Sequence, residues 1–264
     1  MTLLLARAAK AGDRIDLIEF FGYQGMDVEA VRRALPVHEG GAFDDKMRTR
    51  IREAVNTVTD GDATDVASLC CTERGNRVLF IGLPGKSTRT FQLNAKPAGA
   101  TRLPAEFLAL SAKLGQAIYA ATKKGGDAPQ EDDSQGYALI HYPPARKLQL
   151  ELRDYTRAHE AQIYDALENC SRGEQRSAAA AAIGYARRSP QQIAALVRAS
   201  RDIDEGVRDE ATGAIGVLLR ADASLAKQIP GANFIEMAGS GVWMDRNKAA
   251  MVRDTRLLLY IKKE

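Results

Sequence analysis

The sequence predicts an α+β protein, in which a small module of order β-α-α-β-β precedes an all-helical stack of the α-solenoid type. The stack is predicted by an imperfect repeat, because residues 175–184 return as 207–216 with arginine, alanine, isoleucine and glycine at the same 32-residue offset. A looser third copy, 245–249, follows 38 residues later. Repeats of this length that are rich in helix formers form stacked helical hairpins. The low aromatic content of 6% also favours helical packing over a β-sandwich.

The first eleven residues support two interpretations. Residues 2–11 form a short apolar run that contains Arg7 and ends in the small-x-small pattern Ala9-Lys10-Ala11, as at a signal-peptidase site. If this run is the stub of a secretory signal, the protein is periplasmic or secreted. If it is a frayed N-terminal helix, the protein is cytoplasmic.

The cysteines do not decide the compartment. Their number is three, which is odd, and two of them are adjacent in the chain (Cys70, Cys71 and Cys170). Adjacent cysteines seldom bridge, so we expect buried thiols and no disulfide framework.

Residues 12–96 are predicted to form the α+β module. Apolar runs bounded by glycine predict strands, and apolar residues at helical spacing predict helices. The expected strands are 15–21, 65–71, 77–81 and a short 88–93, and the expected helices are 27–35 and 44–58.

This order resembles the POTRA domain, a small module of outer-membrane assembly and secretion proteins. The resemblance is carried by Ile18-Glu19-Phe20-Phe21-Gly22, a strand that ends in glycine, and by Leu35-Pro36-Val37-His38-Glu39-Gly40, which fits the family's L-x-x-x-x-G line. No barrel or membrane anchor follows the module, which departs from the family's usual context. The resemblance implies an exposed strand edge that binds a partner segment by strand addition.

A possible phosphate-binding loop is rejected. Gly85-Lys86-Ser87-Thr88 follows a hydrophobic strand, but a P-loop requires a glycine where Phe80 stands, and Pro84 removes a backbone amide. We therefore expect a turn here and no nucleotide cofactor.

Residues 97–157 are predicted to bridge the two parts with helices at 104–124 and 145–157 and an acidic loop at 125–136. Glu131, Asp132 and Asp133 precede His141, and such carboxylates suit a hard cation. Their spacing fits no EF-hand, so a solvated loop is the favoured interpretation and cation binding is left open.

Residues 158–264 are predicted to form the repeats. Helices are expected at 155–168, from the alanine run 178–182, after the Ser189-Pro190 cap, and at 207–219. Asp202, Val207, Arg208 and Ala211 match the D-x-x-x-x-VR-x-x-A pattern, so residues 171–220 resemble HEAT repeats; residues 222–264 resemble them less closely. That resemblance implies that the aspartate and the arginines Arg176, Arg208 and Arg246 stabilise neighbouring repeats.

The chain from the acidic cluster through the repeats is also similar to a group of uncharacterised bacterial HEAT-repeat proteins. This similarity implies one continuous unit from the middle helices to the repeats, and it implies no activity.

No catalytic arrangement is found in the sequence. His38, His141 and His159 lie in separate elements, no Gly-x-Ser-x-Gly elbow is present, and the charged residues alternate as on solvated helix faces. We therefore expect a non-enzymatic interaction or scaffold protein without cofactor or metal, which binds a protein or peptide.

Trp243 is the candidate contact for such a partner, with core packing as the alternative interpretation. The second hypothesis is nucleic-acid backbone binding along the stack, through the arginines near the repeat turns (Arg187, Arg188, Arg198, Arg201 and Arg220). The net charge of +3 does not by itself require nucleic acid, and no apolar run is long enough to span a membrane.

Overall fold

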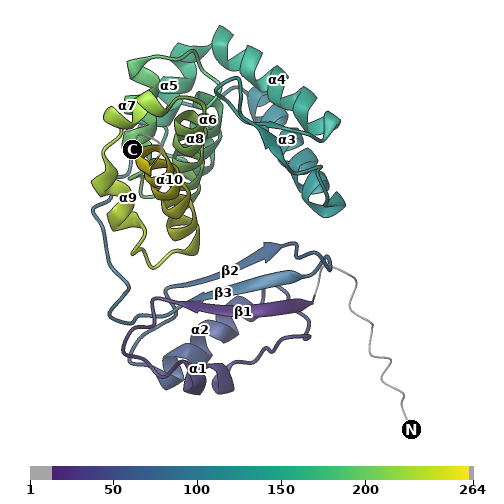
Figure 1. The fold of residues 1–264 in the computed structure, drawn as a ribbon, viewed down its shortest axis with the longest axis vertical. Coiled ribbons are helices and arrows are strands. Elements are labelled where there is room, and N and C mark those ends of the chain that lie inside the picture. Colours follow the sequence, from purple (N-terminus) through teal and green to yellow (C-terminus); the bar gives the residue numbers. More distant parts are fainter. Residues whose placement is uncertain (1–13, 262–264) are drawn as a thin grey trace. The chain divides into compact units, whose positions relative to one another are not determined.

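The computed structural model describes residues 14–261, so the N-terminal run 1–11 lies outside the described residues. The fold is mixed α+β and divides into two compact units (Figure 1). The first contains the chain up to Arg89 together with Gly241–Trp243, and the second contains Thr90–Ser240 and the chain from Met244. The residues predicted to form a bridge, 97–157, thus belong to the same unit as the repeats.

The first unit is a three-stranded sheet with two helices, in the predicted element order. The parallel partner of β3 is β1, and its antiparallel partner is β2, so the strand order is β1-β3-β2. Helices α1 and α2 cover one face of the sheet (Figure 1). Ile15, Ile51 and Leu79 are fully buried in one hydrophobic cluster of this unit. The elements are β1 (Ile15–Phe21), α1 (Val28–Ala34), α2 (Met47–Val58), β2 (Asp65–Cys70) and β3 (Arg77–Gly82).

The strand predicted at 88–93 is wrong. After β3 the chain turns at Gly85, where Thr88 N–H donates to Gly85 O over 2.9 Å. The following backbone groups pair with Arg201 of the second unit, since Asn94 N–H donates to Arg201 O and the Arg201 guanidinium donates to Gln92 O. These groups are therefore satisfied by a helix end and not by a neighbouring strand.

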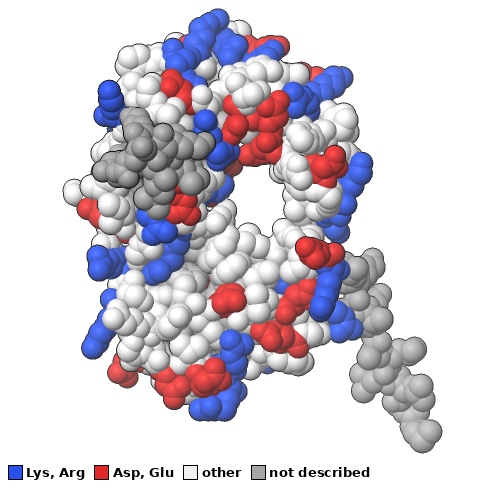
Figure 2. Space-filling view, in the orientation of Figure 1, with Lys and Arg blue, Asp and Glu red and all other residues white. Residues whose placement is uncertain are grey.

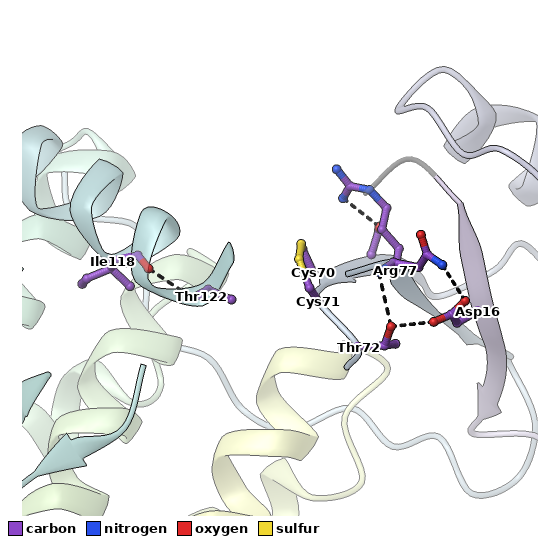
Figure 3. The surroundings of a disulfide bond; sticks show 9 residues. Asp16, Cys70, Cys71, Thr72, Arg77, Ile118 and Thr122 are labelled. Atoms are coloured by element: carbon purple, nitrogen blue, oxygen red, sulfur yellow. Dashed lines mark hydrogen bonds between the residues drawn. A yellow bond between two sulfur atoms is a disulfide. The ribbon is translucent and has the colours of Figure 1, made fainter. Parts of the chain in front are cut away.

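The expectation of free thiols is wrong for Cys70 and Cys71, which form a disulfide across a cis peptide bond (Figure 3). The cis bond brings their Cα atoms to 3.0 Å, so the two side chains lie together at the end of β2. Next to them, Thr72 Oγ1 donates to the carboxylate of Asp16 (Figure 3). Cys170 is free and buried, as expected.

The second unit begins with a helix pair and a small hairpin. Two-residue strands pair Glu131 with Ile140 and Asp132 with Leu139, so the acidic segment 125–136 contains a strand where only a loop was predicted. The strand forms because Leu139 and Ile140 are buried, which requires partners for their backbone groups. These elements are α3 (Ala105–Lys124), β4 (Glu131–Asp132), β5 (Leu139–Ile140) and α4 (Pro143–Ala158).

The helix predicted from 155 begins later, because α4 continues to Ala158 and the chain turns at His159. The remaining helices include those of the sequence repeat. Ser189 caps α7 by accepting a hydrogen bond from Gln192 N–H, and Asp204 caps α8 by accepting one from Val207 N–H. These elements are α5 (Glu160–Asn169), α6 (Gly173–Ile183), α7 (Pro190–Ala199), α8 (Glu205–Ala221), the 3-10 helix η1 (Ala223–Lys227), α9 (Gly231–Met237) and α10 (Trp243–Ile261).

The helices that carry the repeated motif are α6, α8 and α10, and they lie side by side in the second unit (Figure 1). Alanines 179, 180 and 182 of α6 are fully buried, which lets the axis of α6 approach α5 and α8 closely. Across residues 14–261, no helix combines the length and the apolar character that a bilayer crossing needs.

Candidate functional site

Two buried ion pairs connect the repeats. The guanidinium of Arg176 is 1% exposed and donates to both carboxylate oxygens of Asp202, over 2.9 and 2.6 Å. One repeat later, Arg208 donates to both carboxylate oxygens of Asp245, over 2.8 and 2.9 Å. Such buried charges are tolerated only when they are paired and fully hydrogen-bonded.

These two arginines and Arg246, the equivalent residue of the third repeat, also bind the backbone at a constant spacing. Arg176 donates to Cys170 O, Arg208 to Asp202 O, and Arg246 to Ser240 O, in each case the carbonyl six residues earlier. Val207, Ala211 and Asp202 are buried around these contacts. The structure therefore places the repeat residues at the junctions between successive hairpins, on the buried side of α6, α8 and α10.

The other side of these helices borders a cavity of about 380 Å³ within the second unit. Its walls come from α3, α4, the β4–β5 hairpin and the helices α6, α8 and α10, which we call the inner helices. Apolar side chains of α3 and α4 line it together with small residues, carboxylates, two cations and two tyrosines. The charged and aromatic lining residues are Glu131, Tyr137, Glu174, Tyr185, Asp209, Glu210, Arg220 and Lys248. Acidic side chains gather on this part of the second unit, between α6 and α8 and the helix α3 (Figure 2).

The cavity is lined by equivalent positions of successive repeats. The 32-residue offset relates Ser177 to Asp209 and Ala178 to Glu210, and the 38-residue offset relates Glu210 to Lys248. All five residues line the cavity, so this face shows a different residue in each repeat, whereas the buried face shows the same arginine and alanine.

Small residues of α6 and α8 form part of the cavity lining. A further set of equivalent positions holds Ala181, Gly213 and Met251, and a methyl group on Gly213 would lie 3.4 Å from Lys248 Nζ. A methyl group on Gly184 would lie 3.2 Å from Ala214 Cβ, so α6 and α8 are in close contact at that level. The cavity in front of α6 and α8 is thus bordered by positions that carry a methyl group or no side chain.

The charges in the cavity are unevenly paired. Lys248 Nζ lies 3.6 Å from Asp209 Oδ1, and Arg220 is shared between Asp133 and Glu131. Glu174 and Glu210 form no ion pair or side-chain hydrogen bond with any other described residue. Lys248 is near enough to act on Glu210 electrostatically, but neither carboxylate forms an ion pair with a described residue.

The surroundings perturb the acids of α8. Burial raises the pKa of Glu210 to about 7, Asp209 raises it further, and Lys248 opposes the change. Burial also raises the pKa of Asp209, with Lys248 again opposing. The Glu210 side chain is nevertheless exposed at the surface of the cavity, so its raised pKa reflects the protein atoms crowded around a concave site and not complete removal of the carboxylate from water.

Two buried oxygens at the cavity have no hydrogen-bond partner among the described residues, Ser111 Oγ and Asp209 Oδ1. The hydroxyl of Tyr185, by contrast, is satisfied both as donor and as acceptor. It donates to Ala138 O and accepts from Gln149 Nε2, each over 3.1 Å. Burial raises the pKa of Tyr185 above the usual range, so this phenol stays protonated.

The arginines predicted for nucleic-acid binding do not form one group, and each has a partner in the protein. Arg187 pairs with Glu160, Arg198 with Glu168, and Arg201 with Glu236. Arg188 donates to Gly136 O over 3.3 Å.

Trp243 is not among the residues that line the cavity and belongs to the first unit. Its ring centroid is 4.4 Å from that of Phe80 on β3, and its backbone N–H donates to Asp65 over 2.9 Å. The side chain is partly buried by this contact.

The acidic cluster is neutralised by arginines. Arg220 pairs with Asp133 and Glu131, and Arg146 lies 3.3 Å from Asp132. Hydrogen bonds from Ser134 and Arg146 lower the pKa of Asp132. Within residues 14–261 no three His, Cys, Asp or Glu side chains are grouped as they would be around a metal ion.

Sequence reasoning missed the cavity residues Glu174, Asp209 and Glu210. The signal that identifies them is the repeat itself, because aligning Ser177 and Ala178 with Asp209 and Glu210 shows where equivalent positions differ. The contribution of α3 and α4 to the cavity has no such signal, since it depends on packing between distant segments.

Comparison with known proteins matches this chain to no family model, no curated protein and no solved structure.

Proposed function

We propose that the protein is a non-enzymatic binding module, whose HEAT-like helical unit holds a segment of another protein on the inner face of α6, α8 and α10. The observation that carries this proposal is the composition of the inner face, where equivalent repeat positions are uniform on the buried side and different on the cavity side. In repeat proteins the inner, concave surface is the one that binds extended partners.

The buried ion pairs support a HEAT-like stack. Asp202, Val207, Arg208 and Ala211 follow the pattern of that family, and Arg176 and Arg208 connect neighbouring hairpins through carboxylates. A stack held in this way presents its inner face as a preformed surface, which lowers the entropic cost of binding.

The cavity also has the mixed chemistry of a peptide-binding surface. Leu114, Ile118 and Leu152 provide an apolar wall, while Glu174 and Glu210 provide unpaired acceptors. Apolar burial would supply affinity, and the polar groups would fix the register of the bound segment.

Nucleic-acid backbone binding is the alternative, and it has less support. Arg187, Arg198 and Arg201 are paired with carboxylates, and the cavity carries more acids than cations. Phosphates would compete with those carboxylates for each arginine and would be repelled by the cavity.

The test is a selection of linear peptides from a random displayed library on the full-length protein, followed by titration calorimetry. Ala178→Phe places a ring in the cavity, and we expect it to abolish binding of the selected peptides. Ala161→Phe makes the same change at an exposed position of α5, and we expect it to leave affinity unchanged.

The folded state of each variant is checked by circular dichroism and thermal melting, and Ala181→Leu repeats the test if Ala178→Phe does not fold. Selected peptides that bind Ala178→Phe and Ala181→Leu as tightly as the wild type would overturn the proposal. Salt-dependent binding of duplex DNA or RNA, lost in Arg187→Ala and Arg198→Ala, would favour the alternative.

A further inference from the structure

We propose that the cavity of the helical unit receives a cationic side chain, lysine or arginine, from the bound segment, with its charged end between Glu174 and Glu210. This inference rests on the proposed function, since it names the residue that the bound segment must supply.

The first argument is the charge of the lining. Four carboxylates, Glu131, Glu174, Asp209 and Glu210, face the cavity together with two cations, Arg220 and Lys248. Both cations already have carboxylate partners, at 3.7 Å or less. The lining carboxylates that form no ion pair with another described residue are therefore Glu174 and Glu210, which come from adjacent helices, α6 and α8.

The second argument is the shape and chemistry of the walls. A lysine or arginine side chain is apolar along its stem and charged at its end. The cavity matches this division, because Leu114, Ile118 and Met251 line it together with the acids. Its volume of about 380 Å³ accommodates a long side chain and the water around its charged end.

The third argument is the pair of unsatisfied oxygens. Among the described residues, Ser111 Oγ on α3 has no hydrogen-bond partner, and Asp209 Oδ1 on α8 forms no hydrogen bond although its ion-pair partner, Lys248 Nζ, lies 3.6 Å away. A buried acceptor without a donor costs free energy, and an ammonium or guanidinium group brings several donors at once. A bare metal ion fits less well, because one side of the cavity is apolar.

The geometry also explains why an acidic or phosphorylated segment is disfavoured. Charges interact more strongly in a concave site than on an open surface because less water screens them. Glu174 and Glu210 would repel an anion, and Lys248 is already held by Asp209. The site therefore discriminates by charge as well as by shape.

The experiment uses the cavity-dependent peptides from the displayed library, defined as those that lose binding to Ala178→Phe but not to Ala161→Phe. We expect a lysine or arginine at one fixed position of these peptides. Replacing it by norleucine, which keeps the stem and removes the charge, is expected to weaken binding about tenfold or more.

The matched protein variants are Glu210→Gln and Glu174→Gln. The control is Glu151→Gln, at an exposed position of α4 that does not line the cavity. We expect Glu210→Gln to weaken binding of the basic peptide about tenfold and to leave the norleucine peptide within about twofold. Glu151→Gln should change neither affinity.

The outcomes separate the two proposals. Cavity-dependent peptides without a fixed basic residue, or an equal effect of Glu210→Gln on both peptides, would overturn the cationic side chain and leave the binding module intact. Absence of cavity-dependent peptides would overturn both.

Discussion

The two faces of the inner helices follow different rules. On the buried face, the repeat keeps one chemistry, with Arg176 and Arg208 binding a carboxylate and a preceding carbonyl in the same way. On the cavity face, equivalent positions hold Ala178, Glu210 and Lys248. The comparison teaches that repetition in this chain marks the buried contacts between successive helices, and that its loss marks the cavity where we propose that a ligand binds.

The largest expected effect is on the buried face. Arg208→Ala removes the guanidinium that pairs with the buried Asp245, and we expect it to lower the free energy of unfolding by about 3–5 kcal/mol. Urea unfolding followed by far-ultraviolet circular dichroism measures the change. A loss below about 1 kcal/mol would mean that this face does not hold the repeats together.

A smaller effect is expected where the cavity wall is itself structural. Gln149 is buried and connects Ile140 N–H with the Tyr185 hydroxyl, so Gln149→Leu leaves both without that partner. We expect a loss of about 1–3 kcal/mol in urea unfolding. The control is Gln162→Leu on exposed α5, and equal losses in the two variants would contradict the role of Gln149.

On the cavity face, Glu210 should make the stability of the protein depend on pH. The pKa of Glu210 is raised to about 7, so the folded state binds a proton more tightly than the unfolded state does. Stability conferred by this group is therefore complete below the ordinary glutamate pKa and is lost as the pH rises toward 7. Asp209, Lys248 and Glu174 face the same space, and Lys248 limits the effect.

We expect the wild type to lose stability relative to Glu210→Gln as the pH rises from about 4.5 to about 7, with no further divergence above. Thermal melting across this range measures it. The control, Glu151→Gln, should run parallel to the wild type. Parallel curves for Glu210→Gln as well would show that Glu210 is an ordinary hydrated acid.

The smallest effect is expected for the surface arginines. Arg198 pairs with Glu168 at an exposed position, and Arg198→Ala should change the free energy of unfolding by less than about 1 kcal/mol. It should also leave peptide affinity unchanged. A loss as large as that of Arg208→Ala would erase the distinction between buried and surface arginines.

The sequence predicted much of the fold because its signals are local. The strand 15–21, the hairpin around Gly75 and the capped helix after Ser189 are all set by residues close in the chain, and all are present. The strand at 88–93 failed where the carbonyl of Gln92 accepts from Arg201, 109 residues away in the chain, and not from a neighbouring strand.

The buried arginines were predictable from the repeat, but one of their partners was not. Asp202 stands six residues before Arg208, where the HEAT-like pattern expects it, whereas Ser240 holds that place before Arg246. The acceptor for Arg208 is instead Asp245, on the first turn of α10. The cavity was less predictable still, because Ser111 and Gln149 reach it only through tertiary packing.

The most direct test of the account is hydrogen–deuterium exchange of the full-length protein with and without a cavity-dependent peptide. We predict slower exchange in α6 and α8 on binding, with α5, α7 and the strands β1 and β2 unchanged. Slower exchange confined to β1 or β2, or to α5 and α7, would place the ligand elsewhere and contradict the assignment of the cavity as the binding site.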